Sequence, residues 1–133
     1  MVMINQTIKS LVMELKELVI VYGYMIQNAP TEEARRLVEM NLMTVRNCLE
    51  KLEALYYEIT GEMLPPYYGE ASEEVPVFVN FVDAARYAFK EETQVIRMMK
   101  DLHMGVDECY HSIIFGCIVE HQLNAMRMLY LIG

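Results

Sequence analysis

Three polar side chains that could take part in metal binding or proton transfer lie in the second half of the chain, inside segments that are otherwise apolar. In IVEHQLNAM, residues 118–126, His121 and Asn124 have the three-residue spacing that places two side chains on one face of a helix. Glu92 lies on the corresponding apolar stripe of the segment before it. Imidazole and carboxylate groups bind metals and transfer protons, and a carboxylate is costly to bury unless it is paired or bound to a metal. We therefore expect Glu92 to need a partner, and His121 is the first candidate.

The spacing of apolar residues predicts four helices and no strand. The helices cover about 4–28, 32–60, 76–103 and 107–132. The fourth aligns these residues on one stripe: Tyr110, Ile113, Cys117, His121, Asn124, Met128 and Leu131. Pro30, Gly61 and Gly105 mark the breaks between helices. The fold class is therefore all-α.

Connection lengths predict how the helices are paired. The first and third connections are short, so helices one and two, and helices three and four, should form antiparallel hairpins. The middle connection, GEMLPPYYGEASEEV at residues 61–75, could reach roughly 50 Å when extended. Helices of this size are roughly 40 Å long, so that segment can cross the whole bundle. Residues 1–133 should form one four-helix-bundle domain.

Counting outward from the two short turns places six inward-facing residues at one height in the bundle. Paired antiparallel helices bring residues at equal distances from their turn to equal heights. The six residues are Leu15, Val45, Cys48, Glu92, His121 and Asn124. Asn41 also faces inward on the second helix, and we expect it to be a core amide bonded to a tyrosine or to the backbone.

Two segments resemble helices of a known family. MTVRNCLEKLEALYYEITG and FGCIVEHQLNAMRMLYL are similar to the second and fourth helices of ferritin-like di-iron proteins, the rubrerythrin-like family in particular. The resemblance extends over the whole chain and implies a ferritin-like bundle. In that family helices one and three each contribute one Glu, and helices two and four each contribute a Glu-x-x-His pair.

At the six positions that the resemblance assigns to metal ligands, this chain keeps one. Glu92 is retained, and the other positions carry Leu15, Val45, Cys48, His121 and Asn124. A di-iron centre needs about four carboxylates. We therefore expect no di-iron or ferroxidase chemistry, no bound cofactor and no catalysis. The expected role is binding or assembly, with Glu92, His121, Asn124 and Asn41 forming a buried hydrogen-bonded network.

Two alternatives remain open. One is a rubrerythrin-like metal-binding protein or oxidoreductase that holds a single zinc, iron or manganese ion through Glu92, His121 and Cys48. The other is a small-molecule site in a cavity left where Leu15 and Val45 replace ligands. Metal content separates the first alternative from the preferred role, and a large polar pocket in mid-bundle would favour the second.

Composition limits the partners. The chain has 133 residues and a net charge of −8, which argues against binding to nucleic acid or to an anionic membrane surface. Its longest apolar run, LVIVYGYMI, is about half of what a membrane-spanning helix needs. Its three cysteines form no C-x-x-C pair, as is typical of a reducing compartment, and no signal peptide is recognisable at the start. We expect a cytoplasmic protein.

Apolar residues on the outer side of two helices predict self-association. Helix one carries Met13, Ile20 and Tyr24 opposite its core stripe, and helix four carries Val119, Met126 and Tyr130 on its outer side. Apolar residues on the outer faces of two helices indicate a subunit interface. We expect a homodimer or a larger symmetric oligomer.

Overall fold

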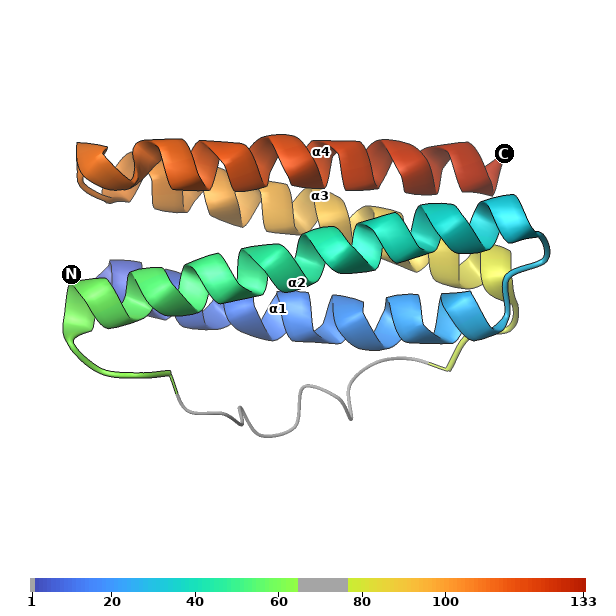
Figure 1. The fold of residues 1–133 in the computed structure, drawn as a ribbon, viewed down its shortest axis with the longest axis horizontal. Helices are drawn as coiled ribbons and strands as arrows, with labels where there is room; N and C mark the ends of the chain where they lie inside the picture. Colours follow the sequence, from blue (N-terminus) through green and yellow to red (C-terminus); the bar gives the residue numbers. More distant parts are fainter. Residues whose placement is uncertain (1, 65–76) are drawn as a thin grey trace.

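The protein is an antiparallel four-helix bundle. The structure is a computed structural model that describes residues 2–64 and 77–133. Its helices are α1 (Val2–Gln27), α2 (Glu32–Thr60), α3 (Phe81–Gly105) and α4 (His111–Ile132), and a 3-10 turn, η2 (Glu108–Tyr110), precedes α4 (Figure 1). The predicted all-α, four-helix architecture is confirmed. The predicted crossover at 61–75 lies mostly outside the described residues, within the long connection between α2 and α3.

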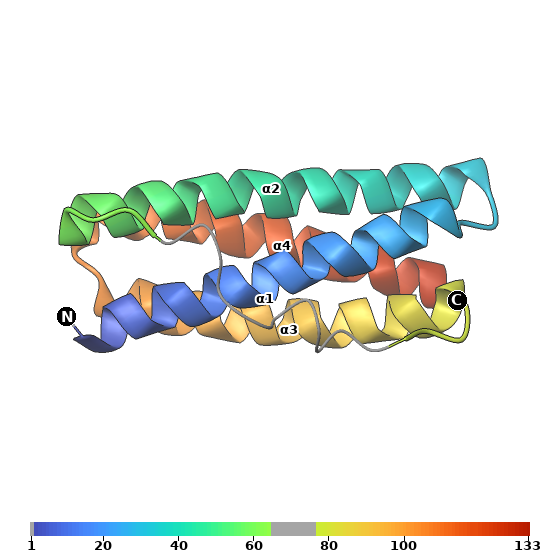
Figure 2. The same cartoon turned by 90° about the horizontal axis from the view of Figure 1, so that it is seen from below.

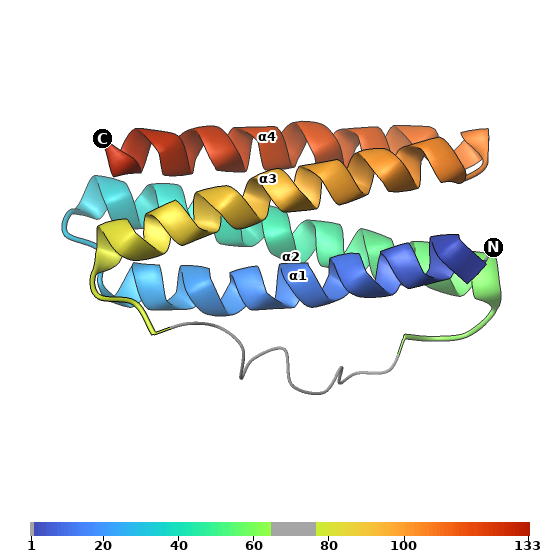
Figure 3. The same ribbon diagram turned by 180° about the vertical axis from the view of Figure 1, so that it is seen from behind.

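The four helices are arranged as two hairpins packed side by side. α1 pairs with α2 and α3 pairs with α4, while α1 also lies against α3 and α2 against α4 (Figures 1 and 3). Each of these neighbouring pairs is antiparallel, and α1 and α4 are diagonal to each other (Figure 2). Every helix therefore turns one face toward a shared core.

Capping side chains define where α2 and α3 begin. Thr31 accepts a hydrogen bond from the Ala34 N–H at 3.0 Å, and Asn80 accepts one from the Asp83 N–H at 2.9 Å. α3 therefore begins at Phe81 rather than near residue 76, where apolar spacing alone had placed its start. α2 ends at Gly61, whose positive φ of 75° favours glycine.

The core follows the predicted stripes with small shifts. Leu15, Val45 and Cys48 are all buried. On α4 the buried residue is Ile114, whereas Ile113, which the stripe included, is exposed. α4 contacts both α2 and α3, so its inner face is wider than a single row of residues and is centred slightly differently.

The outer sides of α1 and α4 differ. On α1, Met13 is half-buried, and Phe78 packs against Tyr24 with ring centroids 5.3 Å apart. The outer side of α4 stays uncovered, with Val119, Met126 and Tyr130 all exposed. Within the described residues, no helix combines the length and apolarity needed to cross a membrane.

Candidate functional site

Side chains from all four helices meet in a buried polar network at the centre of the bundle. Glu92 comes from α3, His121 and Asn124 from α4, Asn41 from α2 and Tyr22 from α1. All five side chains have 0% exposure. The structure thus brings together the four residues expected to form a network and adds a tyrosine to them.

Glu92 is the acceptor at the middle of this network. His121 Nδ1 lies 2.5 Å from Glu92 Oε1. The other oxygen, Oε2, accepts hydrogen bonds from the Tyr22 hydroxyl at 2.5 Å and from Asn124 Nδ2 at 2.9 Å. An ionised carboxylate is only an acceptor, so His121 donates from Nδ1. Three donors from two other helices thus stabilise a charge that burial would otherwise disfavour.

Asn41 and Asn124 clasp α2 to α4. Asn41 Nδ2 donates to the backbone carbonyl of Asn124 at 3.0 Å, and Asn124 Nδ2 donates to the backbone carbonyl of Asn41 at 3.2 Å. Asn41 Nδ2 also donates to the Tyr22 hydroxyl at 3.1 Å. Asn41 therefore meets both kinds of partner considered for it, a tyrosine and a backbone carbonyl. This reciprocal pairing sets the height of one helix against the other.

Arg127 closes the network on its outer side. Its Nη1 atom donates to the amide oxygens of Asn41 and Asn124, both at 3.1 Å. Both carboxamides therefore have partners on the oxygen and on the nitrogen. Buried amides that are fully satisfied rigidify a core, whereas partly satisfied ones destabilise it.

Tyr22 acts as a permanently protonated donor. Burial raises the pKa of its hydroxyl well above the usual value, and the Glu92 carboxylate raises it further. The raised pKa keeps the hydroxyl protonated, so that Tyr22 donates to Glu92.

His121 Nε2 is the one polar atom of this group that has no partner. Since Nδ1 is bonded to Glu92, Nε2 lies on the other side of the ring and is a free acceptor in neutral imidazole. In metal sites, a histidine that binds the metal through one ring nitrogen commonly donates a hydrogen bond from the other nitrogen to a carboxylate. The imidazole therefore has a free nitrogen that could bind a metal, whereas both oxygens of Glu92 are engaged.

The donor set does not fit two metal ions. Leu15 and Val45 offer no ligand atom, and both oxygens of Glu92 are engaged by protein donors. Glu92, His121 and Cys48, the set considered for a single metal, do not gather their ligand atoms within 4.8 Å of one another. The geometry is that of a hydrogen-bonded layer and not of a ligand cage.

Cys48 and Cys117 face each other from α2 and α4, and both are buried. The pKa of the Cys117 thiol is lowered to about 7, first by a hydrogen bond with Cys48 and then by Lys51 and His121, against the effect of burial. The pKa of Cys48 is raised by the same contact and by burial. The sequence patterns placed Cys48 in the mid-bundle layer and Cys117 on the stripe of the fourth helix, and they did not predict that the two thiols pair.

A second group of acidic side chains lies beside the network. Glu14 and Glu17 on α1 and Glu91 on α3 hold carboxylate oxygens within 4.8 Å of one another, the one such group of three among residues 2–64 and 77–133. Burial, followed by the hydrogen bond with Glu14, raises the pKa of Glu91 to about 8. All three side chains are partly exposed. Glu91 was overlooked because it sits next to Glu92, off the apolar stripe.

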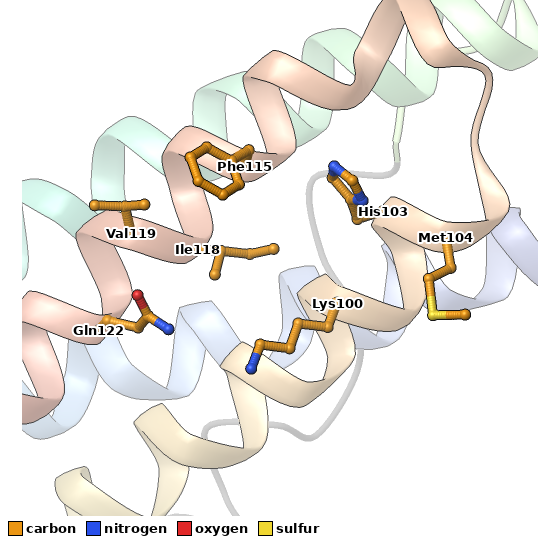
Figure 4. Close-up of a pocket in the computed structure, with 7 residues that line it drawn as sticks. All are labelled: Lys100, His103, Met104, Phe115, Ile118, Val119 and Gln122. Carbon is orange, nitrogen blue, oxygen red and sulfur yellow. The ribbon is translucent and has the colours of Figure 1, made fainter.

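The principal cavities are grooves at the surface of the bundle. One of about 390 Å³ lies between α3 and α4 and is lined by Lys100, His103, Met104, Phe115, Ile118, Val119 and Gln122 (Figure 4). Another of about 350 Å³ lies between α2 and α4, beside Cys48 and Gly116. Neither these nor the other two main grooves in the described part of the chain are lined by Leu15, Val45 or Glu92. None of these four grooves is therefore the mid-bundle cavity that the small-molecule alternative expects beside Leu15 and Val45.

Two network residues were not predicted as site residues. For Tyr22 the available signal was that a buried tyrosine hydroxyl usually needs a hydrogen-bond partner. Arg127 lies three residues after Asn124, on a neighbouring part of the same helix, and that spacing was the available signal for it.

Two other histidines lie far from this network. His111 is half-buried, and its ring stacks on that of His103 with centroids 4.2 Å apart. The two rings meet because η2 folds the start of α4 back against the end of α3.

Fold and site together define the chain as an all-α antiparallel four-helix bundle with a closed polar network in its core. Comparison of the chain with protein-family models, with curated proteins and with solved structures found no match.

Proposed function

We propose that this chain is a ferritin-like bundle whose metal-binding layer has become a hydrogen-bonded network, so that it acts by binding or assembly and catalyses no reaction of its own. The observation that carries this proposal is the hydrogen bonding of Glu92. It is the one carboxylate of the layer, and Tyr22, His121 and Asn124 engage both of its oxygens. A metal would have to break these buried contacts and leave their donors unsatisfied.

The remaining layer positions support the same proposal. Leu15 and Val45 are fully buried and fill their positions with apolar volume. Asn41 and Asn124 each donate a side-chain hydrogen bond to a backbone carbonyl of the opposite helix. Such a layer ties four helices together in one register, a role that buried polar networks fill in other bundles.

The test is the metal content of tag-free protein after anaerobic exposure to iron, manganese and zinc and then desalting, measured by elemental mass spectrometry. We expect near-zero metal per chain. About one metal per chain, lost in Glu92→Ala and in His121→Ala, would overturn the proposal. Glu91→Gln is the matched control, because metal lost only in that variant is held by Glu14, Glu17 and Glu91 and not by the network.

One observation favours a second candidate function, a metalloprotein with a single-metal site. His121 Nε2 is buried without a partner while Nδ1 is held by Glu92. In such a site Glu92 would orient the ring and would not bind the metal, and Nε2 would be the ligand atom of the imidazole. Cobalt(II) titration tests this function: visible cobalt absorption that His121→Ala removes would support it, and no cobalt absorption in the wild type would contradict it.

A further inference from the structure

Among the helices of the described part of the chain, α4 exposes the most large apolar side chains, and they form a row along its outer side. Six of these side chains are between 37% and 64% exposed: Phe115, Val119, Leu123, Met126, Leu129 and Tyr130. A helix that is apolar on both faces is usually covered on both. The inner face of α4 is covered by α2 and α3, and its outer face is open.

The outer residues have the spacing of a helix-pairing seam. Phe115, Val119, Gln122, Met126 and Leu129 follow one another at alternating steps of four and three residues. We call these five residues the outer seam. Alternation of four and three keeps the side chains on one line along a partner helix, as in coiled coils. The seam is therefore suited to a second helix lying along α4.

Charge favours a second copy of this chain as the partner. The outer seam contains no charged residue. The two charged residues of α4 lie off the seam, because Arg127 is bonded to Asn41 and Asn124, and Glu120 lines the groove toward α2. A basic partner would be drawn to the acidic surfaces of a chain with a net charge of −8. A second, equally acidic copy can approach closely only through an uncharged face.

We infer that the outer seam of α4 is a docking surface for the outer seam of a second copy, with the two α4 helices antiparallel about a two-fold axis. This inference rests on the proposed assembly role and names the partner. Antiparallel packing aligns the helix dipoles favourably and makes both halves of the contact identical. With the axis near residue 124, Val119 of one copy meets Leu129 of the other, and Gln122 meets Met126.

The groove beside the seam gives the partner a place to dock. Figure 4 shows Phe115, Ile118 and Val119 of α4 on one side of it and Lys100 and His103 of α3 on the other. Its volume of about 390 Å³ admits an aromatic or leucine side chain. In the antiparallel arrangement, Leu129 and Tyr130 of the second copy lie next to the groove. The two-fold axis repeats this contact at the other end of the seam.

The apolar area is of the size that a dimer contact uses. Six large side chains that are each roughly half exposed present on the order of 500 Å² of surface, taking about 150–200 Å² for each when fully exposed. The largest apolar patch of a typical monomer is about 300–600 Å² and is often functional. A standard interface buries about 800 Å² on each partner, so these side chains alone would supply more than half of such a contact.

The first experiment measures the dissociation constant by sedimentation velocity over a range of protein concentrations. We expect a dimer, and we expect Met126→Glu to weaken it by at least about 100-fold, because each new carboxylate would be buried against the uncharged seam of the other copy. Met43→Glu on α2 is the matched control, since Met43 and Met126 are 66% and 64% exposed and either variant should fold. Met43→Glu should dimerise like the wild type.

Disulfide trapping tests the orientation of the two copies. In a Cys109→Ser background, which removes the exposed native thiol, Val119→Cys protein is mixed with Leu129→Cys protein under mild oxidation. We expect linked dimers in the mixture and few in either variant alone. Linkage of Val119→Cys to itself would overturn the antiparallel arrangement.

A wild-type chain that stays monomeric, or equal loss of dimer in Met43→Glu and Met126→Glu, would overturn the inference. Its failure is distinguishable from failure of the proposed function. A monomer with near-zero metal would contradict only the inferred dimer. A dimer that holds metal through His121 would contradict only the proposal that the metal site is absent.

Discussion

At the scale of single residues, Glu92 is the centre of the molecule's polar chemistry. An ionised carboxylate in an apolar helix face is costly unless donors surround it. Tyr22, His121 and Asn124 provide those donors, and Asn41 and Arg127 complete the second layer of bonds. Removal of one member therefore leaves its neighbours buried without a partner.

Tyr22→Phe isolates one bond of the network. The change removes a hydroxyl that donates to Glu92 and accepts from Asn41, and it alters little volume. We expect a loss of about 1–3 kcal/mol in the free energy of unfolding, because buried polar atoms lose a partner. The melting temperature, followed by circular dichroism, should fall by roughly 4–12 °C. Tyr57→Phe, at an exposed tyrosine, should stay within about 0.5 kcal/mol of wild type. Equal stability of the two variants would contradict the bonding described for Tyr22.

Glu91 should make stability depend on pH. Its pKa is raised to about 8 from an ordinary value of 4.5, so the folded state holds this proton more tightly than the unfolded state does. The stabilisation is complete below pH 4.5 and is lost as pH rises to about 8. Glu91→Gln is neutral throughout and should match wild type at pH 5.

At pH 9, Glu91→Gln should be the more stable protein. Because Glu91 is partly exposed, we expect a gain of only about 1 kcal/mol, or roughly 4 °C in melting temperature. Thermal unfolding at both pH values measures the difference, and Glu50→Gln on the exposed side of α2 is the control. A gain at pH 9 no larger than that of Glu50→Gln would contradict the raised pKa.

At the scale of elements, side-chain caps decide where the helices start. Asn80 and Asp83 form a reciprocal cap, in which Asn80 accepts from the Asp83 N–H and Asp83 accepts from the Val79 N–H at 3.1 Å. This pair sets the start of α3 at Phe81, which also directs Phe78 back onto Tyr24 and Tyr87.

Asn80→Ala removes the acceptor of this cap. We expect a cost of about 1 kcal/mol, seen as a fall of roughly 4 °C in melting temperature. Asn80→Asp keeps a side-chain acceptor and adds a charge that the helix N-terminus favours, so it should retain wild-type stability. A loss of stability as large in Asn80→Asp as in Asn80→Ala would show that the cap is not the cause.

At the scale of the whole molecule, an acidic surface and an uncharged outer seam act in opposite directions on self-association. With a net charge of −8 on each chain, two copies repel at long range. The contact between the seams is apolar and is little affected by salt.

Added salt should therefore strengthen the proposed dimer. Raising NaCl from 0.01 M to 0.1 M shortens the screening length from about 30 Å to about 10 Å, so the repulsion weakens. We expect the dissociation constant to fall several-fold, as measured by sedimentation at each salt concentration. A dissociation constant that rises with salt would indicate a contact made by ion pairs and would contradict an apolar seam.

Much of the architecture was predictable from local patterns. The 3.6-residue period places Glu92, His121 and Asn124 on inward faces whatever the tertiary arrangement, and the short turns pair the helices. Counting from those turns placed Glu92 and His121 at one height, where their side chains meet. The start of α3 was misplaced because apolar spacing continues through Phe78, while the cap at which the helix begins consists of two side-chain bonds that apolar spacing does not reveal.

The sequence by itself therefore determined the helices, their pairing and which polar side chains had to be buried, because these depend on periodicity and on the cost of burying charge. Only the tertiary structure decided which atoms bond. The distance and angle between packed helices direct Tyr22 to Glu92, Arg127 to the two asparagines and Cys48 to Cys117, and these depend on how all four core faces fit together. For the same reason, the tertiary structure alone showed that Phe78 covers part of α1, whereas nothing in the described residues covers the outer side of α4.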